Sequence, residues 1–258
     1  MPPINDATND ATQSLAWQMA VTRGFVYAFL CRALAYPTTE HHAALRERIV
    51  PALEQLDTTN ETAVARRHIP AQLDDMRAEH TAIFSLTVSA DCPDYESAYN
   101  SRDVFQQTQQ MADVGGFYRA HGLEAGGAQA ERPDHITTEL EFMSFLALKE
   151  AHVIEKLGEH ELDMTREAQC LFLRDHLGCW GPGLGGRIEA RAGAASPFYA
   201  AAGGLLTNWL SAECVRFDVV PANIMTEPQL EWPEPEDGAC GAAGDCPLIG
   251  LNEIEVQR

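Results

Sequence analysis

The stretch that decides the fold is Glu131-Arg-Pro-Asp-His-Ile-Thr-Thr-Glu-Leu-Glu-Phe-Met-Ser-Phe-Leu-Ala-Leu-Lys-Glu150. Pro133 suits the first turn of a helix, where its missing N–H costs nothing. Asp134 beside it complements the positive end of the helix dipole. From Ile136 onward the apolar side chains share one broad face at helical spacing, which predicts a long core-facing helix over 133–157.

Three polar side chains, His135, Glu139 and Glu150, fall on the apolar face of this helix. A carboxylate that faces a core is costly unless it is paired or hydrogen-bonded. His135 and Glu139 are four residues apart and can touch, and the helix dipole favours a neutral imidazole at this end. Two interpretations stay open. Either Asp134 caps the helix and Glu139 pairs with a buried arginine, or the acid and the imidazole open onto a binding cleft.

The rest of the chain is dominated by runs with helical apolar spacing, and alternating strand-like runs are scarce. Helices are expected over 12–35, 41–56, 61–86, 102–121, 133–157, 160–178 and 197–216, with a short one over 184–192. The predicted fold class is therefore all-α: a single-domain helical bundle over 12–216, preceded by a flexible N-terminus over 1–11 and followed by an irregular tail over 217–258.

Two long connections and the tail interrupt this pattern. The connections over 89–101 and 121–132 exceed the usual loop length between bundle helices, and long ordered loops are often functional. The tail is acidic, its only cation is Arg258, and its prolines prevent a helix. We expect Leu230 and Trp232 to pack it partly against the bundle.

The composition limits the partners. A net charge of −20, from 38 acidic and 18 basic residues, argues against general nucleic-acid binding and permits basic partners such as an arginine-bearing peptide. The seven cysteines are scattered, without a C-x-x-C pair, which favours reduced thiols and a cytoplasmic location. We expect no secretory signal, and no apolar segment is long enough for a membrane span.

Motifs that would indicate an enzyme are missing. No Glu is followed three residues later by His, and neither a Gly-x-Ser-x-Gly elbow nor a phosphate loop is present. Gly181, Gly183 and Gly186 match Gly-x-Gly-x-x-Gly, but they follow a helix instead of a strand, so we predict a helix stop and a turn there. Cys240 and Cys246 supply only half of a tetrahedral zinc site. We expect no cofactor.

The motif region resembles a known family. Pro133-Asp-His-Ile136 followed by Glu139-Leu-Glu-Phe-Met143 is similar to the signature of the TorD/DmsD/NarJ-type redox-enzyme maturation chaperones. The segment Met111–Leu123, with its Phe117-Tyr118 and Gly122, looks like the one that precedes this signature, and Pro93–Tyr99 resembles the family's Pro-rich loop. The resemblance covers roughly residues 15–216; the acidic tail has no counterpart in the family pattern.

The resemblance implies an all-helical cytoplasmic chaperone without turnover. Such a protein binds the twin-arginine signal peptide and the body of the apo catalytic subunit of a molybdopterin oxidoreductase, until the molybdenum cofactor is inserted. The details look closest to chaperones of dimethyl sulfide dehydrogenase, selenate, chlorate or nitrate reductase-type enzymes. We expect a monomer or dimer, with no nucleic-acid partner and no stable membrane insertion.

The site follows partly from the resemblance and partly from the residues. Pro133, Asp134 and His135 match the family's peptide-binding motif, and Tyr95 and Glu96 lie in the loop that we place at the same cleft. We expect Asp134 and Glu96 to hold the peptide's guanidinium groups through bidentate contacts, beside an apolar groove. The full set of candidate peptide-binding residues is Tyr95, Glu96, Phe117, Tyr118, Gly122, Pro133, Asp134, His135 and Glu139.

Two alternatives remain. A helical metal-dependent enzyme would use His135 and Glu139 with a third ligand, and would carry stoichiometric metal when purified. A helical interaction protein would use its tail as the functional element, with the tail occupying the basic-peptide cleft of the same chain.

Overall fold

The computed structural model describes residues 5–56, 58–85, 89–100, 104–125 and 131–229. Within these ranges every regular element is helical and no strand is present, which confirms the all-α class. The elements are α1 (Asn5–Leu34), α2 (Thr39–Ala43), a π-helical segment (Ala44–Ile49), α3 (Val50–Glu54), α4 (Asn60–Arg67), α5 (Leu73–Phe84), α6 (Ser97–Asn100), α7 (Val104–Ala120), α8 (Ile136–Lys156), α9 (Glu159–Phe172), a second π-helical segment (Leu173–Leu177), α10 (Gly178–Ala192) and α11 (Pro197–Arg216).

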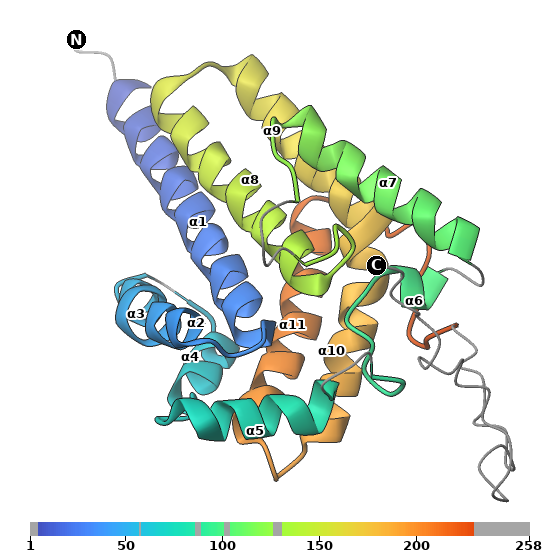
Figure 1. Ribbon diagram of the computed structural model, residues 1–258. Helices are drawn as coiled ribbons and strands as arrows, with labels where there is room; N and C mark the ends of the chain where they lie inside the picture. The colour runs from blue at the N-terminus through green and yellow to red at the C-terminus, as the bar shows by residue number, and fades with distance from the viewer. Residues whose placement is uncertain (1–4, 57, 86–88, 101–103, 126–130, 230–258) are drawn as a thin grey trace, which may run out of the picture.

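Two helix pairs form the centre of the bundle. Helix α1 packs along α8, and α10 packs along α11, with α9 beside α8 (Figure 1). The short helices α4 and α5 pack against α11 and α10, respectively. Among the described helices, none is both long enough and apolar enough to cross a bilayer.

The hydrophobic core is continuous across both helix pairs. Its largest fully buried side chains include Tyr27 of α1, Phe172 of α9, Trp180 of α10 and Tyr199 of α11. Amphipathic helices reach stability by burying such a face, since their local propensity alone is marginal. The helices that flank the motif region therefore share one hydrophobic core.

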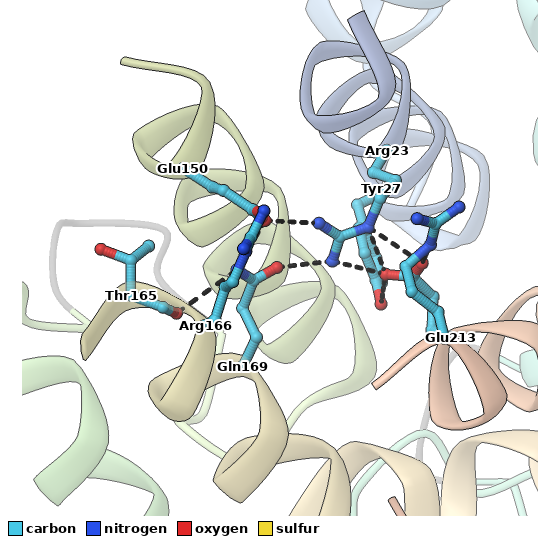
Figure 2. A network of polar contacts seen from close by, with 8 residues as sticks. Arg23, Tyr27, Glu150, Thr165, Arg166, Gln169 and Glu213 are labelled. Carbon is cyan, nitrogen blue, oxygen red and sulfur yellow. Dashed lines mark hydrogen bonds and ion pairs between the residues drawn. The ribbon is translucent and has the colours of Figure 1, made fainter. Parts of the chain in front are cut away.

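A buried charge network joins the two pairs (Figure 2). The guanidinium of Arg23 on α1 lies 2.7 Å from Glu150 on α8 and 2.7 Å from Glu213 on α11, and it donates to Gln169 on α9. Burial alone would lower the pKa of Arg23, but Glu213 and Glu150 raise it above the ordinary value. Glu150, which the sequence places on the core face, is thus paired as its burial requires.

Helix α1 begins earlier than predicted. It starts at Asn5, so part of the stretch expected to be a flexible N-terminus is helical. The expected helix over 41–56 is present as one helical run from Thr39 to Glu54 with the π-helical segment in its middle.

The predicted helix over 61–86 is wrong as a single element. The chain forms α4 and α5, with a break between Arg67 and Leu73. Pro70 lies in this break: proline cannot donate a backbone hydrogen bond, and it disfavours helical dihedral angles at Ile69 before it.

The predicted stop near Cys179–Gly183 is also wrong. Helix α9 runs through the second π-helical segment into α10, so Gly181, Pro182 and Gly183 are all helical. Tertiary packing overrides the local signal here. The side chain of Leu210 on α11 packs against Gly181, and the hydroxyl of Thr207 donates to the carbonyl of Pro182 at 3.0 Å.

After Phe217 the chain has no helix as far as Gln229. This segment follows α10: Ala222 N–H donates to the carbonyl of Arg174, Met225 N–H donates to the carbonyl of Cys179, and Met225 is buried. The tail residues expected to pack or to bind metal, Leu230, Trp232, Cys240 and Cys246, lie outside the described residues.

Candidate functional site

Helix α8 begins at Ile136, later than the sequence predicts. His135 is its N-cap residue, and the imidazole Nδ1 accepts the N–H of Thr137 at 3.2 Å. Pro133 and Asp134 lie in the turn before the helix, so the interpretation in which Asp134 caps the helix is wrong. A ring nitrogen that accepts a hydrogen bond carries no proton; the ring proton is therefore on Nε2, which lies 3.2 Å from Asp94 Oδ2.

Asp134 does not cap the helix because its carboxylate is engaged elsewhere. It is fully buried and accepts two hydrogen bonds from Arg132, at 2.9 Å each, and one from the N–H of Ser97. Backbone bonds add to this contact: Glu96 N–H donates to Asp134 O, and Ile136 N–H donates to Asp94 O. The motif thus joins the connection before α6 to the start of α8.

Glu96 is buried on the other side of the motif. Its carboxylate lies 3.1 Å from Nδ1 of His176, in the second π-helical segment, and both side chains are almost completely inaccessible. The ring of Phe117 packs edge-on against the imidazole of His176. The expectation that Asp134 and Glu96 offer open carboxylates to a guanidinium is therefore wrong, because the paired loops draw both side chains inside and give them partners within the chain.

Glu139 is likewise buried on the core face of α8. Its Oε2 accepts the indole N–H of Trp180 at 3.1 Å, and Oε1 has no partner among the described residues. Neither the expected buried arginine nor His135 bonds to it, because His135 bonds to Thr137 and Asp94 instead. Burial, and then the nearby Glu96 carboxylate, raise the pKa of Glu139 well above its ordinary value.

This raised pKa gives a pH dependence. A buried carboxyl group with a raised pKa binds its proton more tightly in the folded state, so wild-type stability falls as the pH rises above the ordinary Glu pKa of about 4.3. Glu139→Gln removes this titration. We expect the stability of Glu139→Gln relative to wild type to be higher at pH 8 than at pH 5, measured by urea unfolding.

The matched control is Glu141→Gln, which changes an exposed carboxylate on the same helix. Its stability difference from wild type should stay nearly constant between the two pH values, since exposed charges are screened by solvent. A Glu139→Gln difference that is equally flat would contradict a raised pKa of Glu139.

A cleft of about 820 Å³ opens beside the motif, within the usual size range of ligand sites, roughly 300–1,000 Å³. Its walls come from the end of α1 and the residues after it, from the connection after α7, and from the first turns of α8. The apolar part of the lining consists of Ala35, Tyr36, Tyr118, Leu123, Ala125, Phe142 and Phe145. The cleft therefore offers an aromatic surface to an apolar ligand.

The charged side chains of the cleft are mostly acidic. Glu124, Glu131 and Glu141 line it and are exposed, whereas the basic side chains of the lining are Arg32 and His41. Arg32 pairs with Glu141 at 2.9 Å. An acidic lining around an aromatic surface suits a ligand that is both basic and apolar.

The motif Pro133-Asp134-His135 supports the wall of this cleft. Of the nine predicted site residues, Tyr118 lines the cleft, and its hydroxyl donates to the carbonyl of Pro133 at 2.7 Å. Gly122 ends α7 with a φ of +72°, a left-handed conformation that glycine adopts without strain, and directs the chain towards Leu123. The motif thereby positions cleft residues on either side of itself, Glu131 before it and Thr137 after it.

The other predicted site residues lie outside the cleft lining. Tyr95 packs under the guanidinium of Arg132, whose Cζ is 4.5 Å from the ring centroid, and Phe117 packs with Phe172 and His176. The motif turn itself consists of Pro133, Asp134 and His135, and Glu96 and Glu139 are buried, as described above. None of the cleft residues Arg32, Tyr36, Glu141 and Phe145 was among the predicted site residues.

One signal for Glu141 was available. It lies in the family-like string Glu139–Met143 but off the apolar face of the helix, and such a position is typical of an exposed side chain. Arg32 and Tyr36 carry no such signal, because only the packing of α1 along α8 brings them to the cleft.

The metal-enzyme alternative has no ligand set in the described residues. There, no three side chains of His, Cys, Asp or Glu converge in a way that could hold a metal ion. His135 and Glu139 have separate partners, Asp94 and Trp180, respectively.

Comparison with known proteins identifies the family. The nitrate reductase delta subunit family matches residues 32–184. The perchlorate reductase assembly chaperone protein of Dechloromonas aromatica (strain RCB) is 28% identical over 196 residues, which cover 70% of this chain and 84% of that protein. The selenate reductase assembly chaperone protein of Thauera selenatis is 28% identical over 187 residues, covering 70% and 83%. The chain belongs to the nitrate reductase delta subunit family of NarJ/TorD-type chaperones, which assist the assembly of molybdoenzymes.

Proposed function

We propose that this chaperone binds the apo catalytic subunit of a molybdopterin oxidoreductase, of the perchlorate or selenate reductase type, and holds it by a twin-arginine signal peptide seated in the cleft beside α8. The relatives' roles in perchlorate and selenate reductase assembly support the class of client. The observation that carries the proposal is the cleft itself, in which exposed carboxylates surround an aromatic surface.

The chemistry of such a peptide matches this lining. A twin-arginine signal presents two guanidinium groups followed by an apolar helix. Exposed Glu131 and Glu141 can accept charge-assisted bonds from the guanidiniums, while Phe142 and Phe145 offer apolar contact to the residues that follow. The net charge of −20 speeds the encounter with a basic segment.

The chaperone works without turnover in this proposal. It binds the signal peptide in the cytoplasm and keeps the subunit available to the machinery that inserts the molybdenum cofactor. The chaperone then releases the subunit for export or assembly. The motif residues Pro133, Asp134 and His135 take part indirectly: they hold the cleft wall in place through buried bonds and make no contact with the peptide.

Titration calorimetry with a synthetic twin-arginine signal peptide tests the proposal. We expect micromolar or tighter binding by wild type, and at least about tenfold weaker binding when both arginines of the peptide are replaced by glutamine, since a charge-assisted hydrogen bond contributes about 1.5–3 kcal/mol. Phe145→Asp places a charge on the aromatic surface and should weaken binding by a similar factor.

The matched control is Phe105→Asp, the same change at a side chain that is 89% exposed and outside the cleft lining. It should leave the affinity within about twofold of wild type. A wild-type protein that gives no heat with signal peptides of either client class, and that captures no apo-subunit, would refute the proposed function.

A further inference from the structure

Arg32 occupies an unusual position in the cleft. It lies in the last turn of α1 and, among the described residues that line the cleft, it alone contributes a guanidinium. Its Nη2 donates to Oε1 of Glu141 on α8 at 2.9 Å. The side chains of Arg32 and Glu141 are 31% and 62% exposed, so this pair lies at the open side of the cleft.

Arg32 makes fewer hydrogen bonds than the nearby Arg132. Arg132 makes two bonds to buried Asp134 and one to Ser97, and it stacks on Tyr95. Arg32 makes a single bond to one exposed carboxylate, and its Nη1 also donates to Sγ of Cys31 at 3.4 Å. An exposed pair with a single contact contributes little to stability, so Arg32 can leave Glu141 without loss of the fold.

Departure of Arg32 would complete an acidic surface. Glu124 and Glu131 also line the cleft, and within the described residues neither forms an ion pair. With Glu141 released, all three carboxylates face a ligand and the guanidinium that opposes a basic peptide is gone. Arg32 therefore occupies one of the carboxylates that could accept a bond from a client arginine.

We propose that Arg32 is a built-in competitor: in the free chaperone its guanidinium occupies Glu141, and an arginine of the client peptide displaces it. This inference rests on the proposed function and adds a regulatory residue to the same site. Because the peptide must displace Arg32, its apparent affinity is the intrinsic affinity multiplied by the fraction of molecules in which Glu141 is free. The built-in pair thereby weakens retention of the client and favours its release.

Calorimetry on four proteins tests this: wild type, Arg32→Gln, Glu141→Gln and the double variant, each with the twin-arginine peptide. We expect Arg32→Gln to bind about three- to tenfold tighter than wild type, because the competitor is removed. Glu141→Gln should bind more weakly than wild type. In the double variant the gain from Arg32→Gln should vanish, because the carboxylate that Arg32 blocks is no longer present.

Arg119→Gln is the matched control for the change in net charge, since Arg119 is exposed and lies outside the cleft lining. It should bind like wild type. An Arg32→Gln variant that binds equally or more weakly, or whose gain persists in the double variant or is matched by Arg119→Gln, would overturn the competitor role and leave the proposed function standing. Absence of binding in wild type and Arg32→Gln alike would overturn both.

Discussion

Replacement of Arg23 by Met is expected to lower the free energy of unfolding by about 3–5 kcal/mol, as measured by urea denaturation. Arg23 bonds to Glu150 and Glu213, which are both buried, and to Gln169 (Figure 2). Methionine preserves much of the side-chain volume but leaves two carboxylates in the core without their main counter-charge. The cost is the desolvation of these unpaired charges, more than the loss of the bonds themselves.

A triple variant separates these two causes. With Glu150→Gln and Glu213→Gln added to Arg23→Met, this network no longer contains a carboxylate, and we expect recovery of at least half of the lost stability. The control is Arg77→Met, which breaks an exposed pair with Asp74 and should cost less than about 1 kcal/mol. An Arg23→Met loss no larger than that of Arg77→Met would contradict a structural role for the network.

The same network predicts how the loss varies with pH. Burial alone would raise the pKa of Glu150, but Arg23, Arg166 and Gln169 lower it below its ordinary value. A carboxylate with a lowered folded-state pKa stabilises the protein above its ordinary pKa of about 4.3, and this contribution is lost as the pH falls through the folded-state value. The difference between wild type and Arg23→Met should therefore be largest near neutral pH and become smaller in acid.

Gly203→Ala is the second large effect. A Cβ at Gly203 of α11 would lie 2.6 Å from the carbonyl oxygen of Gly185 and 2.7 Å from the amide nitrogen of Glu189, both backbone atoms of α10. Backbone atoms cannot rotate away, so the two helices must separate along their whole contact. We expect a loss of about 3 kcal/mol in unfolding free energy, at the upper end of overpacking effects.

Gly204→Ala is a matched control on the next residue of the same helix. A Cβ there would meet only the Glu189 carboxylate at 3.5 Å, an ordinary contact. Because alanine has a higher helix propensity than glycine, this variant should be more stable than wild type by up to about 1 kcal/mol. Equal effects of the two substitutions in urea unfolding would rule out close contact between α10 and α11 at Gly203.

Local pattern predicted most helices but not all of their ends. Apolar spacing predicted α1, α7, α8, α9 and α11, because the residues that a helix buries recur along the sequence with the helical period. The errors arose where two signals compete. Pro70 broke a helix that the spacing alone would continue, whereas Pro182 did not, because α10 is held against α11.

The sequence predicted which segments lie beside the candidate site, but not which of their side chains are exposed. The motif residues do lie beside a cleft, and Tyr118 lines it. Asp134 and Glu96 were expected to hold the peptide's guanidinium groups, yet both are buried and have partners in other segments. Asp134 accepts the N–H of Ser97, and the Glu96 carboxylate lies against the imidazole of His176. Pairing between distant segments leaves no local trace in a sequence.

By itself, the sequence determined the helical class, the motif before α8 and the acidic character of the chain, because periodicity, family-like residues and charge are properties of neighbours along the chain. Only the tertiary structure decided which carboxylates face solvent. The contact of α1 with α8 brings Arg32 to Glu141 at the cleft, and the bonds between the two loops bury Asp134 and Glu96. Burial is set by the packing of all the helices together, so the exposed and the hidden acids could be told apart only in the folded molecule.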